Sequence, residues 1–160
     1  MKKKRSETRF QEAKVKVRGS LKIVQQNVMT GEKLIKETPN LVVNDARTQQ
    51  ARLLGGSGVT SRYVNRVALG TNPVEPTVDD TTITEAVYSD ISTVEYPDIE
   101  YVAAAVRFTA EFGTGVGNGK TFQEAGLICA DNQLFARQTF SPMTKSENWV
   151  WTIVWTIQWL

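Results

Sequence analysis

The residues closest to a known chemical motif are the glycines and the lysine of residues 113–121, GTGVGNGKT. A phosphate-binding P-loop has the pattern G-x-x-x-x-G-K-[ST], in which backbone amides surround the phosphate oxygens. Counting back from Gly119-Lys120-Thr121 puts the first glycine of that pattern at position 114, where this chain has Thr114. The residues after Lys120 also read as a strand, whereas a P-loop leads into a helix. We therefore expect a loop between two strands and no bound nucleotide.

The other reactive side chains form no catalytic set. The chain has no histidine, which excludes Ser-His and Cys-His catalysis and imidazole metal ligands. Its single cysteine, Cys129, stands in an apolar stretch and is expected to be a buried, unreactive thiol. Asp79 and Asp80 fall in a polar loop without a pattern of further ligands, so we expect solvated acids. The sequence thus predicts no enzymatic activity, no metal and no cofactor.

The tryptophans are the most unusual feature of the composition, because all of them fall in the last twelve residues. They alternate with polar or smaller residues, which places them on one face of a single strand: Trp149, Trp151, Trp155 and Trp159. A row of large rings needs cover, so we interpret it first as a core face. A subunit interface and a stacking surface for sugars remain alternatives.

Residues that alternate between apolar and polar dominate the rest of the chain and predict β-strands. About eight strands and one helix are expected. The helix should begin at Asn44 or Asp45 and stop at Gly55-Gly56, and a short strand around Leu34-Ile35 should end at Pro39-Asn40. The clearest strands are expected at residues 15–23, 63–69, 101–112, 121–130, 134–140 and 149–160, with short or irregular ones at 83–88 and 91–96. We predict a mainly β chain with a single β-sandwich or jelly-roll-like domain over residues 15–160, and a barrel as the alternative.

The positive charge of the chain is concentrated at its start. Residues 1–22 carry a net charge of +7, so the remaining residues carry −5 to give the total of +2. We expect residues 1–14 to form a basic arm that contacts an acidic partner or a second copy of the chain, through Lys2, Lys3, Lys4, Arg5, Arg9, Lys14, Lys16 and Arg18. A solvated tail is the alternative. Nucleic acid is a weaker partner, because Phe10 is the only aromatic residue in the arm.

No targeting or membrane segment is expected. Met1 to Arg5 has the charge of a signal-peptide n-region, but the polar residues 6–12 stand where an apolar region would have to follow. Apolar stretches fall far short of the ~20 residues that cross a bilayer as a helix.

Several short motifs, in order, resemble a group of small virion structural proteins of tailed bacteriophages, and also the head regions of some phage tail-fibre and collar proteins. The resemblance covers residues 40–160, about three-quarters of the chain. It rests on Asn40-Leu41-Val42-Val43 with the helix after it, Val67-Ala68-Leu69-Gly70-Thr71, Asp80-Thr81, Glu85, Phe108-Thr109-Ala110-Glu111-Phe112, Gln123-Glu124-Ala125-Gly126-Leu127, Leu134-Phe135-Ala136-Arg137, Phe140, Pro142, Lys145 and Thr152-Ile153-Val154-Trp155-Thr156-Ile157.

The resemblance implies an all-β domain that assembles with itself and with the particle. Together with the tryptophan row, it leads us to expect a trimer. The leading expectation is a non-enzymatic accessory protein that decorates the capsid exterior, located in the virion and bound to the major capsid protein. A neck, baseplate or tail-fibre attachment protein is the rival within this class. From another class, a carbohydrate-binding module would need exposed tryptophan rings.

Overall fold

More than half of the described residues belong to strands. The computed structural model describes residues 16–58, 60–97 and 104–160. These ranges contain one helix, α1 (Asn44–Leu54), and eight strands: β1 (Val17–Asn27), β2 (Lys33–Val42), β3 (Val64–Gly70), β4 (Val87–Glu95), β5 (Ala104–Phe112), β6 (Thr121–Cys129), β7 (Leu134–Thr144) and β8 (Trp149–Trp159). The prediction of a mainly β chain with one short helix is confirmed.

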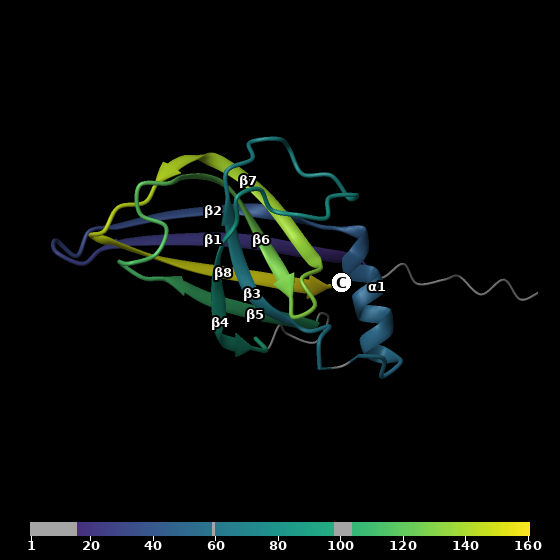
Figure 1. The fold of residues 1–160 in the computed structure, drawn as a ribbon. Helices are drawn as coiled ribbons and strands as arrows, with labels where there is room; N and C mark the ends of the chain where they lie inside the picture. The colour runs from purple at the N-terminus through teal and green to yellow at the C-terminus, as the bar shows by residue number, and fades with distance from the viewer. Residues whose placement is uncertain (1–15, 59, 98–103) are drawn as a thin grey trace, which may run out of the picture.

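The strands close into an antiparallel barrel in the order β1-β2-β7-β6-β3-β4-β5-β8 (Figure 1). Strand β8 lies between β1 and β5 and pairs with both along most of its length. The expected sandwich or jelly roll is therefore replaced by the barrel that the sequence left as an alternative. The sheet closes at β8, because β1 pairs with one edge of this strand and β5 pairs with the other. Strand β8 therefore has no exposed edge, unlike the outer strands of a sandwich.

Two strands turn the corners of the barrel. The first part of β2 pairs with β1, whereas Leu41 and Val42 pair with β7. In β4, the residues up to Asp90 pair with β3 and those from Ile91 onward pair with β5, with a register shift at Ser92. Such strands pass from one side of a barrel to the other through bends or bulges.

The boundaries of β2 and β4 also differ from those predicted from the sequence. Strand β2 continues through Pro39, which lies opposite Ser20 of β1. A proline lacks the backbone N–H and is tolerated where a strand pairs on one side only, and β7 reaches β2 only at Leu41 and Val42. The two short segments expected at 83–88 and 91–96 are instead one strand, β4.

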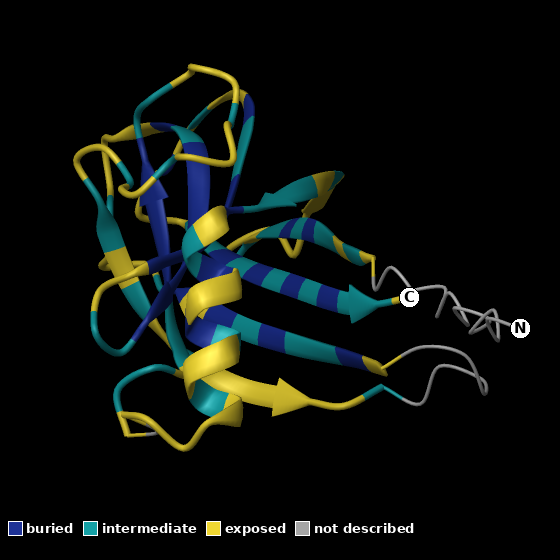
Figure 2. Cartoon of the chain, turned by 90° about the vertical axis from the view of Figure 1, so that its right-hand side faces the viewer, coloured by how far each residue is buried: buried dark blue, intermediate teal, exposed yellow. Residues whose placement is uncertain are grey.

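Inward-facing side chains of the strands form the core, which Figure 2 shows as dark bands alternating with lighter ones along the strands. Trp151 and Trp155 are fully buried there, and the Trp151 and Phe122 rings form a T-shaped pair with centroids 5.7 Å apart. A second, smaller cluster lies on the outer side of the wall, where Ile128 and Leu134 pack with Val43 and Ala68. The segment 71–86 covers this cluster through Ile83 and Ala86.

Helix α1 runs over the predicted residues and packs against β7 at one end of the barrel (Figure 1). Its N-cap position is Val43, which makes no side-chain cap bond, so neither Asn44 nor Asp45 caps it. Asn44 instead donates a 3.0 Å hydrogen bond to Asp79 Oδ1 in the segment 71–86. At the other end, the Gly55 and Gly56 amides bond to carbonyls of the last turn.

Candidate functional site

The glycine-rich stretch lies in the turn between β5 and β6, as the sequence predicts. Thr121 begins strand β6 and pairs with Thr144 of β7. No helix follows Lys120, so the feature that gives a P-loop its helix N-terminus is missing from this described segment. The Lys120 side chain is exposed.

A different lysine holds this loop in place. Lys145 is fully buried, and its Nζ donates to the carbonyl oxygen of Gly113 at 2.7 Å and to Asn118 Oδ1 at 3.2 Å. Burial lowers the pKa of Lys145, because the charged ammonium loses its hydration. Backbone hydrogen bonds between Lys145 and residues 119 and 120 add to the attachment. This lysine therefore fixes the β5–β6 loop.

Cys129 is buried at the end of β6, as expected. Burial, assisted by the negative charge of Asp131, raises the pKa of the Cys129 thiol to about 12. The thiolate is the reactive form of cysteine, so this side chain is protected against alkylation and oxidation at neutral pH. The described residues contain no group of three or more histidine, cysteine, aspartate or glutamate side chains that could hold a metal ion.

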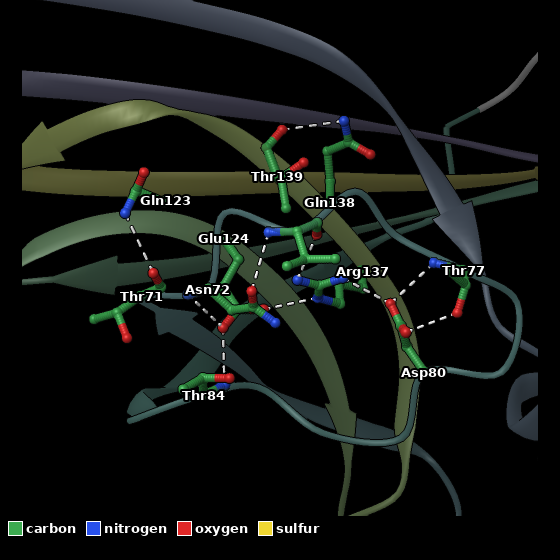
Figure 3. Close-up of polar contacts among 11 residues, drawn as sticks. Thr71, Asn72, Thr77, Asp80, Thr84, Gln123, Glu124, Arg137, Gln138 and Thr139 are labelled. Carbon is green, nitrogen blue, oxygen red and sulfur yellow. Dashed lines mark hydrogen bonds and ion pairs between the residues drawn. The ribbon is translucent and has the colours of Figure 1, made fainter.

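The strongest polar cluster of the described chain surrounds Arg137 in β7, shown in Figure 3. Its guanidinium donates to Glu124 Oε2 at 2.7 Å, to Asp80 Oδ2 at 2.7 Å and to the Val74 carbonyl oxygen at 2.9 Å. Arg137 and Glu124 are almost completely buried. The expectation that Asp80 is a solvated acid is therefore wrong: it pairs with Arg137 and is largely covered.

Further hydrogen bonds satisfy the carboxylate oxygens of Glu124 and Asp80. Glu124 Oε1 accepts from the backbone amides of Asn72 at 3.1 Å and Thr84 at 2.8 Å. Asp80 accepts from the amide and hydroxyl of Thr77. Burial by itself would raise the pKa of Asp80, but the bonds from Thr77 and the charge of Arg137 outweigh it and hold that pKa below its usual value. The cluster fastens the segment 71–86 to the barrel wall and leaves no group poised for chemistry.

Sequence reasoning did not find this cluster, although a signal was present. Glu124 and Arg137 are the single charged residues of their strands and have apolar neighbours, and such residues are rarely buried without a partner. Their pairing depends on β6 and β7 being neighbours, with Gly126 opposite Arg137. The third member, Asp80, comes from a loop more than forty residues away, and its position follows only from the fold.

The tryptophan row divides between the core and the ends of β8. Trp151 and Trp155 are fully buried inside the barrel, so they offer no surface for a subunit contact or a sugar. For these two residues the core interpretation is confirmed and the interface alternative is wrong. Trp149 and Trp159 are partly buried at the two ends of the strand.

An apolar cavity of about 460 Å³ opens at the end of the barrel beside α1. We call it the apolar mouth. It is lined by residues of α1, β3, β4, β5, β7 and β8, and its walls are mainly hydrophobic, with Leu53, Val94, Val106, Phe108, Phe135 and Trp159. Two exposed tyrosines belong to its lining, Tyr63 before β3 and Tyr96 after β4. Among the described cavities this is the one suited to an apolar group.

Two polar side chains reach this cavity. Arg62 is already occupied, because its guanidinium bonds to the Ser57 carbonyl oxygen, to Gln49 and to Asp131. Gln50 differs, because its amide nitrogen is buried and has no hydrogen-bond partner among the described residues. A buried donor without a partner costs about 1–3 kcal/mol, so a group that supplied an acceptor there would be favoured.

Of the predicted basic arm, the structure describes only Lys16 and Arg18. Both side chains are exposed, Arg18 on the outer face of β1. Lys2, Lys3, Lys4, Arg5, Arg9 and Lys14 lie outside the described residues.

Comparison with protein-family models, with curated proteins and with solved structures finds no match for this chain. In the described part of the chain, α1 is too short and too polar to cross a membrane.

Proposed function

We propose that this chain is a non-enzymatic structural protein of a tailed-bacteriophage particle, which acts by binding other virion proteins. The observation that carries the proposal is the apolar mouth, with the exposed Tyr63 and Tyr96 in its lining. Contiguous apolar surface of this kind is typical of protein contacts. The sequence motifs that resemble phage virion proteins point in the same direction.

The buried polar cluster supports a structural role for those motifs. Asp80, Glu124 and Arg137 all belong to segments that carry the resemblance, and together they fasten a long loop to the barrel wall. Gly70, from another such segment, leaves the space that Glu124 occupies. These residues therefore serve the stability of the fold, as expected for a particle component that must withstand long exposure to solvent.

Within the particle, we place the protein on the capsid exterior as an accessory that stabilises the shell, in contact with the major capsid protein. The basic residues of positions 1–22 would bind an adjacent subunit or an acidic shell surface, because they oppose the net charge of −5 on the rest of the chain. Self-association, as a trimer, is part of the same proposal.

The test is to locate the protein in purified phage particles by mass spectrometry and by gold-labelled antibody in electron micrographs. Label over the capsid surface is the expected result. Label confined to the neck, baseplate or tail fibres would move the protein to the rival position in the same particle. Particles without the protein would overturn the proposal.

Two further experiments address the arm and the oligomer. Deletion of residues 2–14 should lower the occupancy of the protein on particles at physiological salt, and unchanged occupancy would contradict a role of the arm. Light scattering on the purified protein should give a mass above that of one 17.9 kDa chain.

The carbohydrate-binding alternative receives no support from the tryptophans, since Trp151 and Trp155 are enclosed by the barrel. Iodide quenching of tryptophan fluorescence, with and without soluble glycans, distinguishes the two functions. A lectin would show quenching that glycans relieve. An ATP-binding assay with the Lys120→Ala variant tests the P-loop interpretation in the same way, and we expect no binding by either form.

A further inference from the structure

Strand β2, which forms one long hairpin with β1 in Figure 1, has an edge without a neighbour over much of its length. Strand β1 pairs with β2 from its start to Asn40, but β7 pairs with it only at Leu41 and Val42. The pairing with β7 stops at Pro39, because proline has no backbone N–H to continue the ladder. Residues 33–38 therefore form an open edge in the wall, which we call the β2 edge.

The unpaired backbone groups of this edge belong to alternate residues. The Asn27 N–H donates to the Glu32 carbonyl oxygen, which makes these two residues a hydrogen-bonded pair of the β1–β2 ladder. Such pairs recur at every second residue of an antiparallel ladder. The N–H and C=O groups of Lys33, Ile35 and Glu37 therefore point away from β1, and they have no backbone partner among the described residues.

Apolar side chains on the β2 edge are exposed to solvent. Ile35 is 63% exposed and Leu34 is 49% exposed. Lys36 does not cover them, because it lies on the inner face with its Nζ 5.9 Å from the centre of the Phe140 ring. An open strand edge with apolar side chains is a template to which another strand can add.

The outer face of the β2 edge is complementary to itself. Its side chains follow the order Lys33, Ile35, Glu37, and neither charged residue forms an ion pair among the described residues. Two such edges can pair antiparallel about a two-fold axis at Ile35. Each Ile35 then lies opposite its counterpart, and Lys33 of each chain lies opposite Glu37 of the other. The same register that pairs the charges also pairs the unsatisfied backbone groups.

We propose that the β2 edge binds the β2 edge of a second copy of this chain, antiparallel and centred on Ile35. Lys33, Ile35 and Glu37 each exchange two backbone hydrogen bonds with the opposite chain. The contact ends at Pro39, which has no N–H to add. This pairing depends neither on the virion assignment nor on the apolar mouth. It is compatible with a trimer, because six copies can combine a two-fold and a three-fold axis.

Charge reversal in the full-length chain tests the register. Lys33→Glu or Glu37→Lys alone places like charges opposite each other at both ends of the contact, and each should weaken self-association about tenfold in analytical ultracentrifugation. The double variant restores opposite charges and should associate like the native chain. The two single variants, once mixed, should pair with each other. Lys120→Glu, which changes the net charge at an exposed loop residue, should have no effect.

Carbodiimide cross-linking of the native chain tests the contact directly, because this reagent joins an amine to a carboxylate only when the two touch. Lys33 and Glu37 of one chain are four residues apart along a strand, or about 13 Å, so they do not meet within that chain. We expect a covalent dimer on a denaturing gel, with a peptide that joins Lys33 to Glu37. Lys33→Gln should lose this product, and Lys120→Gln should keep it.

Three outcomes would overturn the proposal. One is association of the single charge-reversal variants that equals that of the native chain, and another is failure of the mixed variants to pair. The third is a cross-linked product that lacks the peptide joining Lys33 to Glu37, which would assign the β2 edge to another partner. The position of the protein in the virion is tested by labelling of particles, so either proposal can fail while the other holds.

Discussion

Arg137 Nε lies 2.7 Å from Glu124 Oε2, and this ion pair is almost completely buried in the wall of the barrel. The two side chains sit on the neighbouring strands β6 and β7, beneath the segment 71–86. Because each polar atom of Glu124 has a partner, the pair joins two strands and a loop without leaving an uncompensated charge.

Removing either member of this pair should destabilise the fold strongly. Glu124→Gln and Arg137→Met should each lower the free energy of unfolding by about 3–5 kcal/mol, because each change removes one half of the buried ion pair and leaves the other charge without that partner. Urea unfolding followed by fluorescence measures the change. Arg107→Gln is the matched control: Arg107 and Glu95 form an exposed pair, and the expected loss is below about 1 kcal/mol. Equal losses in the two pairs would contradict this account.

Asp80 should make stability depend on acid pH. Its pKa is lower in the folded chain than the usual 3.8, so its stabilising effect is complete above pH 3.8 and is lost as the pH falls further through the folded value. Asp80→Asn removes this titration. The difference in unfolding free energy between the native chain and the variant should therefore narrow below pH 3.8. A difference that stays constant from pH 6 to pH 2 would show that Asp80 is not held by Arg137 and Thr77.

Gly70 should not tolerate a methyl group. A Cβ at this position would lie 2.5 Å from Glu124 Oε1 and 2.6 Å from the Thr84 carbonyl oxygen, so the ion pair or the loop must shift. We expect Gly70→Ala to cost about 1–3 kcal/mol of unfolding free energy. Gly113→Ala is the matched control, because a Cβ there meets nothing within 4 Å. A Gly70→Ala chain as stable as the control would contradict the close packing at this position.

Lys145 should control the order of the β5–β6 loop. Lys145→Met keeps the length of the side chain but leaves the Gly113 carbonyl oxygen and Asn118 without their donor. Amide hydrogen exchange at Val116, whose N–H bonds within the loop, should become faster. Lys120→Met changes an exposed lysine of the same loop and should leave that exchange rate unchanged. Slow exchange in both variants would assign the order of the loop to its backbone alone.

The sequence predicted the local structure well where apolar and polar residues alternate, as in β1, β5 and β8. Helix α1 and the turn between β5 and β6 also follow from local signals, namely Gly55-Gly56 and the glycines of residues 113–119. Closure of the sheet could not be predicted in this way, since it depends on β8 pairing with both β1 and β5. The same holds for the partners of Arg137, which come from separate parts of the chain.

The tryptophan row shows that alternation along a strand predicts which face a side chain is on but not how deeply it is buried. Alternation placed all four rings on one face, but it could not separate Trp151 and Trp155, which are enclosed, from Trp159 at the open end. That distinction depends on the length of β8 relative to its neighbours and on the position of α1. The apolar mouth could not be predicted for the same reason, because its walls come from six different elements.

The central place of β8 has a consequence for synthesis on the ribosome. Strands β1 and β5 each need β8 as a neighbour, yet β8 is the last strand of the described chain to be made. Until residues 149–159 have emerged, the nascent chain holds two unmatched strand edges and an open hydrophobic interior. The barrel can therefore close only after β8 has left the ribosome, and until then the exposed apolar segments of the nascent chain are open to chaperones and to aggregation.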